Sequence, residues 1–151
     1  MYMYNYPMPA VTVDVVLFRE SGEELEVLLI ERGKEPFLGQ LAFPGGHVEP
    51  TETVEQAAVR ELLEETGIAL TVDELMLVGV FSKPGRDPRG WYISITFLAV
   101  IDKDVEIKAG DDAAKVGWHQ LKNPMYHFDV ANKLAFDHAE MLEKAIWEYR
   151  D

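Results

Sequence analysis

The sequence contains no cysteine among its 151 residues. A disulfide framework, a thiolate metal site and catalysis by a cysteine nucleophile are therefore excluded. Long apolar runs are also missing: the longest, around Ile93–Ile101, is interrupted by Ser94 and Thr96, and a membrane span needs roughly 18 residues. Residues 1–10 lack the basic and apolar regions of a secretory signal peptide. We therefore expect a soluble, cytoplasmic protein with no membrane partner.

Basic residues are scarce: 14 Lys and Arg face 27 Asp and Glu, for a formal net charge of −13 at pH 7. This balance argues against a nucleic-acid partner, because duplex binding draws affinity from basic side chains that neutralise phosphates. A phosphorylated small molecule stays compatible, since bound divalent cations reverse the local charge. The apolar fraction of 48% is that of a globular protein, and the length suits one domain over residues 1–151.

Hydrophobic periodicity predicts an α/β (α+β) chain, with a mixed sheet and two helices. In the first strand, every second residue from Val11 to Leu17 is aliphatic, which predicts one face that is better buried than the other. The expected strands are Val11–Phe18, Leu25–Glu31, Leu41–Phe43, Leu75–Ser82, Trp91–Ile101 and Lys115–His119, and the expected helices are Val54–Thr66 and Asp129–Tyr149.

Residues at both ends of the middle helix predict where it begins and where it ends. Thr53 and Gln56 fit a capping box at its start, and Gly67 suits the left-handed residue beyond its end. One side of this helix is apolar, and we expect it to pack under the sheet. The apolar residues are Val59, Leu62 and Leu63.

A second face of the same helix carries three carboxylates. At about 100° per residue, Glu61, Glu64 and Glu65 lie on one side, without the lysines that a solvated helix would intersperse. Such crowding is repulsive, whereas hard oxygen ligands around one point suit Mg²⁺ or Mn²⁺. The preceding Gly45 and Gly46 would let a backbone carbonyl approach. The alternative is a merely acidic, solvated face.

Residues 46–68 resemble the Nudix box at every fixed position: glycine, five residues, glutamate, seven residues, then Arg-Glu-apolar-x-Glu-Glu-x-Gly-apolar. The fixed positions are Gly46, Glu52, Arg60, Glu61, Leu62, Glu64, Glu65, Gly67 and Ile68. The resemblance implies an α/β/α sandwich around a mixed sheet. It also implies a Nudix pyrophosphohydrolase, which hydrolyses a nucleoside diphosphate linked to another moiety.

The resemblance also assigns roles to residues of the box. It implies that Glu61 and Glu65 bind Mg²⁺ or Mn²⁺ directly, and that Glu64 joins them directly or through water. The carbonyl of Gly46 would be a further ligand. Metals would then screen the negative diphosphate and acidify the attacking water.

Two further pairs follow from the same comparison. Arg60 and Glu52 would form an orienting salt bridge, and Asp111 or Asp112 would supply a fourth carboxylate, unless these two belong to a simple polar turn. A histidine metal site is not expected, because the later histidines lack ligand spacing. These are His119, His127 and His138; His47 follows the glycines and faces either the site or solvent.

The segment Lys83–Gly90 (KPGRDPRG) resembles the corresponding loop of ADP-ribose pyrophosphatases within the Nudix family. The opening strand and residues 127–142 resemble the same group. This implies hydrolysis of ADP-ribose to AMP and ribose 5-phosphate. The alternatives are another Nudix substrate (a nucleoside triphosphate, a dinucleoside polyphosphate or a nucleotide sugar) and a non-catalytic ADP-ribose sensor.

The same loop supplies candidate substrate-binding residues. Lys83, Arg86 and Arg89 place cations in an acidic chain, where they either bind phosphates or form a basic surface turn. Phe81 and Trp91 flank the loop and either stack on a base or pack in the core.

One observation and one expectation argue against a non-catalytic ADP-ribose sensor. Every carboxylate of the Nudix box is present, and we expect no DNA-binding extension after the last helix. The tyrosine-rich start either adds a strand or contacts a second copy of the chain, since dimers are common among ADP-ribose-type members. Its tyrosines are Tyr2, Tyr4 and Tyr6.

Overall fold

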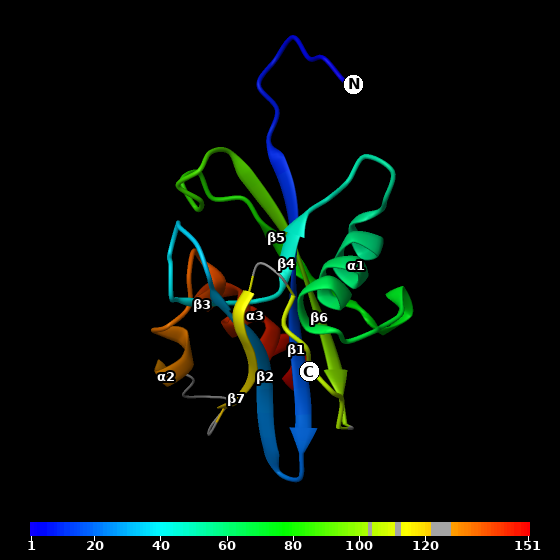
Figure 1. Ribbon diagram of the computed structural model, residues 1–151, viewed down its shortest axis with the longest axis vertical. Coiled ribbons are helices and arrows are strands. Elements are labelled where there is room, and N and C mark those ends of the chain that lie inside the picture. The colour runs from blue at the N-terminus through cyan, green and yellow to red at the C-terminus, as the bar shows by residue number, and fades with distance from the viewer. Residues whose placement is uncertain (103, 111–112, 122–127) are drawn as a thin grey trace.

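The computed structural model describes residues 1–102, 104–110, 113–121 and 128–151. Within these residues, seven strands form one mixed sheet in the order β3-β2-β1-β6-β5, with β4 paired to β1 and β7 to β2 (Figure 1). Strands β1 and β6 run parallel, and the other pairs are antiparallel. The strands are β1 Ala10–Ser21, β2 Glu24–Arg32, β3 Leu41–Ala42, β4 Gly45–His47, β5 Met76–Phe81, β6 Tyr92–Ile101 and β7 Ala113–Leu121.

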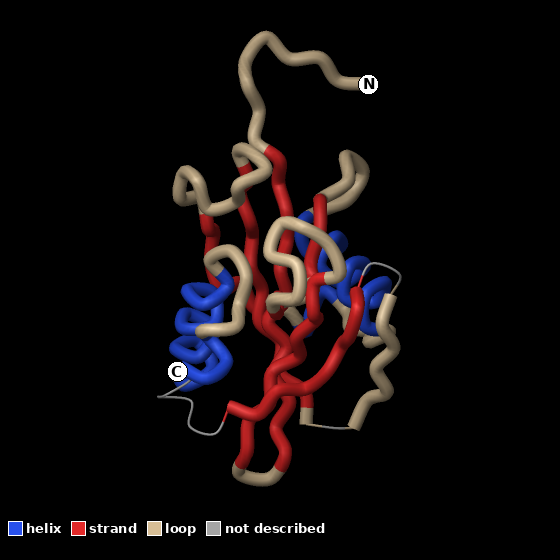
Figure 2. Tube along the Cα trace, turned by 60° about the vertical axis from the view of Figure 1, so that its left-hand side comes forward, coloured by secondary structure: helices blue, strands red, loops and turns tan. Residues whose placement is uncertain are grey.

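Helices cover both faces of the sheet, which confirms the expected α/β/α sandwich (Figure 2). Helix α1 (Val54–Thr66) lies on one face and α3 (His138–Arg150) on the other; a 3₁₀ turn, η1, spans Val72–Glu74, and a short α2 spans Phe128–Ala131. Helix α1 starts with the predicted capping box and ends at Gly67, whose φ is 76°. No helix in the described ranges is long and apolar enough to cross a membrane.

Strand β1 is buried on both faces, so the prediction of one better-buried face is wrong. Val13 and Val15 pack in the core beneath α1, whereas Val16 and Phe18 pack in the core beneath α3. The cause is the position of β1 between β2 and β6 in a sheet covered on both sides. Asp14 is therefore carried into a nearly closed environment, where it is only 8% exposed.

Helix α1 is rotated relative to the predicted apolar face. Leu62 is fully buried as expected, but Leu63 is 49% exposed, and Ala57 and Ala58 are buried in its place. This rotation points the carboxylate face toward β4, which packs against α1. Because Gly45–His47 consists of two glycines and one exposed histidine, β4 can approach the helix closely.

The single helix predicted over Asp129–Tyr149 is also wrong: the chain forms α2, an irregular segment, and then α3. The irregular segment pairs with β3, because Leu41 donates a backbone hydrogen bond to Lys133 and accepts one from Ala135. Phe136 then adopts a left-handed φ of 52°, which no helix accommodates. This interruption places residues 133–135 against Leu41 of β3.

Candidate active site

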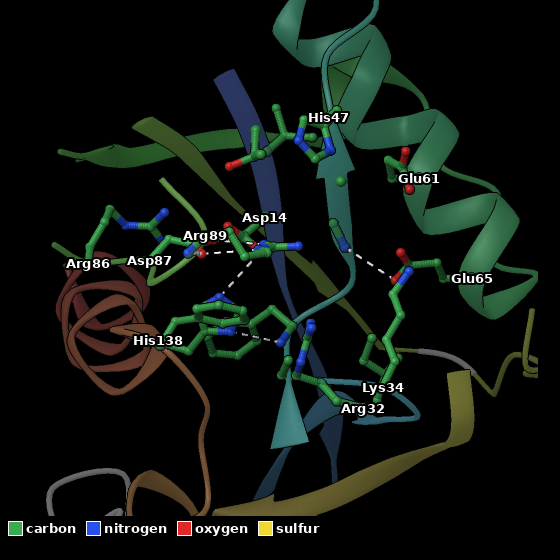
Figure 3. A pocket seen from close by; sticks show the side chains of 18 of the residues that line it. Asp14, Arg32, Lys34, His47, Glu61, Glu65, Arg86, Asp87, Arg89 and His138 are labelled. Carbon is green, nitrogen blue, oxygen red and sulfur yellow. Dashed lines mark hydrogen bonds and ion pairs between the residues drawn. The ribbon is translucent and has the colours of Figure 1, made fainter. Parts of the chain in front are cut away.

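A pocket of about 370 Å³ lies between α1 and the start of α3, with β4 along its floor (Figure 3). One wall carries Glu61 and Glu65 of α1, and the facing wall carries Arg86, Asp87 and His138. The pocket therefore combines an anionic side with a side that contains cations and aromatic rings.

The anionic wall is packed closely onto the glycines of β4. The Gly45 amide donates to Glu65 Oε2 at 3.3 Å. A Cβ atom built on Gly46 would lie 2.5 Å from the Glu61 carboxylate. Contacts under 3 Å are not tolerated by real Cβ atoms, so Gly46 is required for Glu61 to occupy this position. The predicted Gly46 ligand thus lies directly beside Glu61.

Arg60 connects the other acidic residues of the box. Its Nε and Nη2 atoms donate to Glu52 at 3.0 and 2.6 Å, and its Nη1 atom donates to Glu61 at 2.7 Å and to the more exposed Glu64 at 3.2 Å. Hydrogen bonds from Arg60 lower the pKa of Glu52 to about 2. The same contacts raise the pKa of Arg60, with the bonds to Glu52 as the largest cause. This pair fixes the guanidinium beside Glu61.

The two inner carboxylates are held in an unfavourable environment for negative charge. Burial, with the nearby Glu61 as the next cause, raises the pKa of Glu65 to about 8. Burial also raises the pKa of Glu61, although the hydrogen bond from Arg60 opposes this. Carboxylates crowded in this way are hard oxygen donors whose repulsion a divalent cation would relieve. The donor set of this wall therefore fits Mg²⁺ or Mn²⁺.

The structure does not assemble a complete metal cage from its described residues. Within them, no three Asp, Glu, His or Cys side chains gather into a group that could hold a metal ion. The candidate fourth carboxylates, Asp111 and Asp112, lie outside the described residues, as does His127. Mg²⁺ usually keeps several waters and shares substrate phosphate oxygens, so two carboxylates can suffice on the protein side.

The facing wall holds the predicted loop arginines in internal ion pairs. Arg86 donates through Nε and Nη2 to Asp137 at 2.9 and 2.7 Å, and its side chain is 4% exposed. Arg89 donates to Asp87 at 3.0 and 2.7 Å. Burial would raise the pKa of Asp87, but the hydrogen bonds from Arg89 outweigh it and hold this pKa below its usual value. Both arginines line the pocket.

The other predicted substrate residues lie elsewhere. Lys83 is exposed and Trp91 is 55% exposed, and neither lines the pocket. Phe81 packs against the core beneath α3, with the Lys144 ammonium 5.9 Å from its ring centre. The structure therefore separates these three side chains from the carboxylates of α1.

Sequence reasoning missed a series of contacts between buried polar side chains at the base of the pocket. Ser94 donates its hydroxyl hydrogen to Asp14 at 2.5 Å, and His138 Nε2 lies 3.5 Å from the other oxygen of Asp14. The Phe43 amide donates to His138 Nδ1 at 3.1 Å. Burial lowers the pKa of His138, so the neutral ring with its proton on Nε2 fits these contacts. The position of Asp14 between Val13 and Val15 in an expected strand was the available sequence signal.

Two cations at the end of β2 were missed as well. The Arg32 guanidinium lies 4.8 Å from the ring centre of Phe136, and its Nε donates to the carbonyl of Pro36 at 2.6 Å. Its Nη2 atom is buried without a hydrogen-bond partner in the described structure. Lys34 is exposed at the pocket and forms no hydrogen bond or ion pair with the described residues. These cations remain available to an anionic ligand.

The family profile described as "NUDIX domain" matches residues 8–145, which is most of the chain. The chain belongs to the Nudix family. This Nudix chain is 44% identical over 138 residues to an ADP-ribose pyrophosphatase from Methanocaldococcus jannaschii, covering 91% of this chain and 73% of that protein. It is 32% identical to the ADPR responsive transcriptional repressor NtrR of Acinetobacter baylyi, covering 93% of this chain but 54% of the repressor.

Solved Nudix structures agree with the fold. The NUDIX domain of Shewanella oneidensis NrtR, solved with ADP ribose, matches with a TM-score of 0.83 at 29% identity, covering 95% of this chain and 90% of that one. A bifunctional NMN adenylyltransferase/ADP ribose pyrophosphatase from Francisella tularensis, solved with AMP and a manganese ion, matches with a TM-score of 0.80 at 32% identity. The match covers 96% of this chain and 43% of that protein.

Proposed function

We propose that this Nudix hydrolase cleaves ADP-ribose to AMP and ribose 5-phosphate with the help of Mg²⁺ or Mn²⁺. The observation that carries the proposal is the pocket itself, in which a wall of crowded carboxylates faces a wall with cations and aromatic rings. A diphosphate between two sugars needs both: metal ligands for its reacting oxygens and cationic groups for the rest of its charge. The similarity to an ADP-ribose pyrophosphatase over most of the chain supports this substrate.

The residues of the anionic wall would hold the metal. Glu61 and Glu65 are the proposed direct ligands, with the Gly46 carbonyl and Glu64 as further donors. When bound, the cation screens the diphosphate and acidifies the attacking water. Arg60 holds Glu61 in place through the hydrogen bond described above, and its pair with Glu52 fixes the guanidinium from which that bond is made.

The cations at the end of β2 would complement the substrate's remaining negative charge. Lys34 and Arg32 line the pocket, and neither is used in an ion pair within the described residues. Charge-assisted hydrogen bonds to phosphate are roughly twice as strong as neutral ones. We therefore add these two residues to Arg89 as proposed contributors to substrate binding.

ADP-ribose sensing without hydrolysis is the competing function. Its support is the similarity to the NtrR repressor and to the NrtR domain solved with ADP ribose. Binding and sensing need no set of crowded carboxylates on α1, whereas hydrolysis does. The complete set in this chain favours hydrolysis.

A substrate panel tests the proposal. Purified protein with Mg²⁺ is offered ADP-ribose, a nucleoside triphosphate, a dinucleoside polyphosphate and a nucleotide sugar, and the products are separated by chromatography. We expect the highest kcat/KM for ADP-ribose, with AMP and ribose 5-phosphate in equal amounts. Tight binding of ADP-ribose without turnover would establish the sensor instead, and a preference for triphosphates would refute the substrate assignment.

A further inference from the structure

Arg86 is an enclosed cation of the pocket, and its guanidinium is hydrogen-bonded to a carboxylate. Two of its nitrogen atoms bind the carboxylate of Asp137, and its side chain is only 4% exposed. Asp137 is 14% exposed and precedes α3 without making a side-chain cap hydrogen bond to the helix. Its carboxylate is thus committed to Arg86 rather than to its own helix.

The Arg86–Asp137 ion pair joins two segments that are 51 residues apart in sequence. Arg86 belongs to the turn between β5 and β6, and Asp137 lies between Phe136 and His138 at the start of α3. Both neighbours of Asp137 line the pocket. The ion pair therefore anchors the short segment 136–138 to the turn between β5 and β6.

Segment 136–138 needs such an anchor because its backbone is in an unusual conformation. A bulky residue with positive φ is an outlier, and such a conformation persists only where the surroundings hold it. Phe136 has φ 52° and packs its ring against Phe37, at 4.7 Å between ring centres. Phe37 itself has φ 62°. The guanidiniums of Arg32 and Arg89 lie 4.8 and 5.4 Å from the centre of the Phe136 ring.

The residue after Asp137 transmits this placement to the base of the pocket. His138 accepts from the Phe43 amide and directs Nε2 toward Asp14. The stacked rings of Phe43 and His138, at 5.2 Å between centres, fix the imidazole plane. A shift of segment 136–138 would therefore move Phe136 and His138 together, and would release the oxygen of Asp14 that faces the imidazole.

We propose that Arg86 and Asp137 are positioning residues, whose ion pair holds segment 136–138 as the wall that receives the part of the substrate remote from the metal-binding carboxylates. The inference rests on the proposed function for the identity of the substrate. It gives Arg86 an indirect role, through Asp137, in place of a main role as a phosphate contact. The carboxylates of α1 lie on the other side of β4 (Figure 3) and are not held by this pair.

The indirect and direct roles of Arg86 predict opposite results for Asp137→Asn. If Arg86 acts through Asp137, removing either charge displaces the same wall, and removing both adds nothing. If Arg86 binds phosphate directly, Asp137→Asn frees the guanidinium and leaves binding unchanged or tighter. The experiment compares wild type, Arg86→Ala, Asp137→Asn and the double variant by calorimetric titration with ADP-ribose in EDTA, so that no turnover occurs.

We expect each single variant to weaken ADP-ribose binding by about ten- to a hundredfold, because a displaced wall loses one or two contacts to the ligand and each good contact is worth up to about tenfold in affinity. The double variant should bind no more weakly than the weaker single one. In steady state with Mg²⁺, KM should rise by a similar factor while kcat changes by less than about threefold, a split that general destabilisation does not produce. The control is Arg19→Ala, which removes an arginine from the ion pair with Glu26, remote from the pocket.

Wild-type affinity in Asp137→Asn together with weak binding in Arg86→Ala would overturn the proposal, as would wild-type affinity in all variants. Because a buried charge left unpaired is destabilising, the single variants risk failing to fold. The double variant Arg86→Met with Asp137→Leu then tests the positioning role, because apolar residues of similar volume often replace a buried ion pair without loss of stability. We expect it to bind ADP-ribose within about threefold of wild type, because packing retains the wall; a loss above tenfold in the folded protein would overturn the proposal.

The outcomes also separate this inference from the proposed function. A wild type that binds ADP-ribose without cleaving it refutes the hydrolase and leaves the comparison of variants valid. Normal hydrolysis in every variant refutes the positioning role and leaves the hydrolase intact. If the panel selects another nucleotide, the same proteins are titrated with that nucleotide.

Discussion

Replacing Gly46 with alanine adds one methyl group at the closest approach of β4 to α1. The new Cβ would lie 2.5 Å from both Cδ and Oε1 of Glu61 and 2.7 Å from its Oε2. No other side chain or backbone atom appears among its three nearest neighbours. Gly46 does not have a positive φ, so the substitution introduces no backbone strain. The perturbation is therefore directed at one carboxylate.

The geometry sets the size of the effect. Ordinary contact between heavy atoms is about 3.5 Å, so the carboxylate of Glu61 must move by about 1 Å. The end of a glutamate side chain can make this shift at a cost of about 1–2 kcal/mol in rotamer and packing energy. A 1 Å displacement of a metal ligand should cost about a hundredfold in kcat. Stability should therefore fall slightly and activity severely.

The assay measures the melting temperature and kcat of Gly46→Ala beside Gly117→Ala. Gly117 lies in β7, has no atom within 4 Å of a built Cβ and no positive φ, so its variant should match wild type in both measurements. Gly46→Ala should lose about 2–8 °C in melting temperature and about a hundredfold in kcat. A Gly46→Ala enzyme within about twofold of wild-type kcat at saturating Mg²⁺ would refute the placement of Glu61 as a metal ligand beside Gly46.

Further outcomes follow from the carboxylates of α1. Glu61→Gln and Glu65→Gln should each lower kcat by at least about a hundredfold. Their melting temperature in EDTA should equal or exceed that of wild type, because the substitutions relieve charge repulsion and the burial of charge. Near-native turnover in either variant would contradict the assignment of these residues as metal ligands. Mg²⁺ should raise the melting temperature of wild type by mass action but not that of Glu65→Gln, and excess EDTA should abolish activity. Burial and the nearby Glu61 raise the pKa of Glu65 to about 8, so the folded state favours the protonated form of this carboxyl group. Protonated Glu65 therefore contributes fully to stability below pH 4.5, the ordinary pKa, and this contribution is lost as the pH rises through about 8. The melting temperature in EDTA should therefore fall as the pH rises across that interval, whereas the affinity for Mg²⁺ should rise. An Mg²⁺ affinity that stays constant from pH 6 to about 8 would contradict the raised pKa of Glu65. Light scattering tests whether the tyrosine-rich start joins two copies of the chain, and a monomer at every concentration would exclude that alternative.

The features that sequence reasoning predicted are those set by residues close together in the chain. The capping box at Thr53, the left-handed Gly67 and the carboxylates of α1 all lie within one helix and its ends. The sandwich followed from periodicity combined with the resemblance to the Nudix family. Local sequence could not fix the rotation of α1, because the approach of β4 depends on pairing with β1, which lies far away in sequence.

The parts that sequence reasoning missed depend on long-range contacts. Asp14 meets Ser94 across 80 residues, and Phe43 meets His138 across 95. The predicted C-terminal helix is interrupted because tertiary pairing with β3 competes with helical hydrogen bonds. From composition, the cations of the loop Lys83–Gly90 were predicted to be free to bind substrate. In the structure, Arg86 is bound to the carboxylate of Asp137, which only the fold brings near.

Metal-dependent hydrolysis at this pocket is tested most directly by the rate at which the wild-type protein converts ADP-ribose to AMP with Mg²⁺, measured beside Glu65→Gln. We expect stoichiometric AMP and ribose 5-phosphate from the wild type, no product in EDTA, and at least about a hundredfold slower turnover in the variant. AMP formation that continues unchanged in EDTA, or that Glu65→Gln retains at the wild-type rate, would contradict metal-dependent hydrolysis at this pocket.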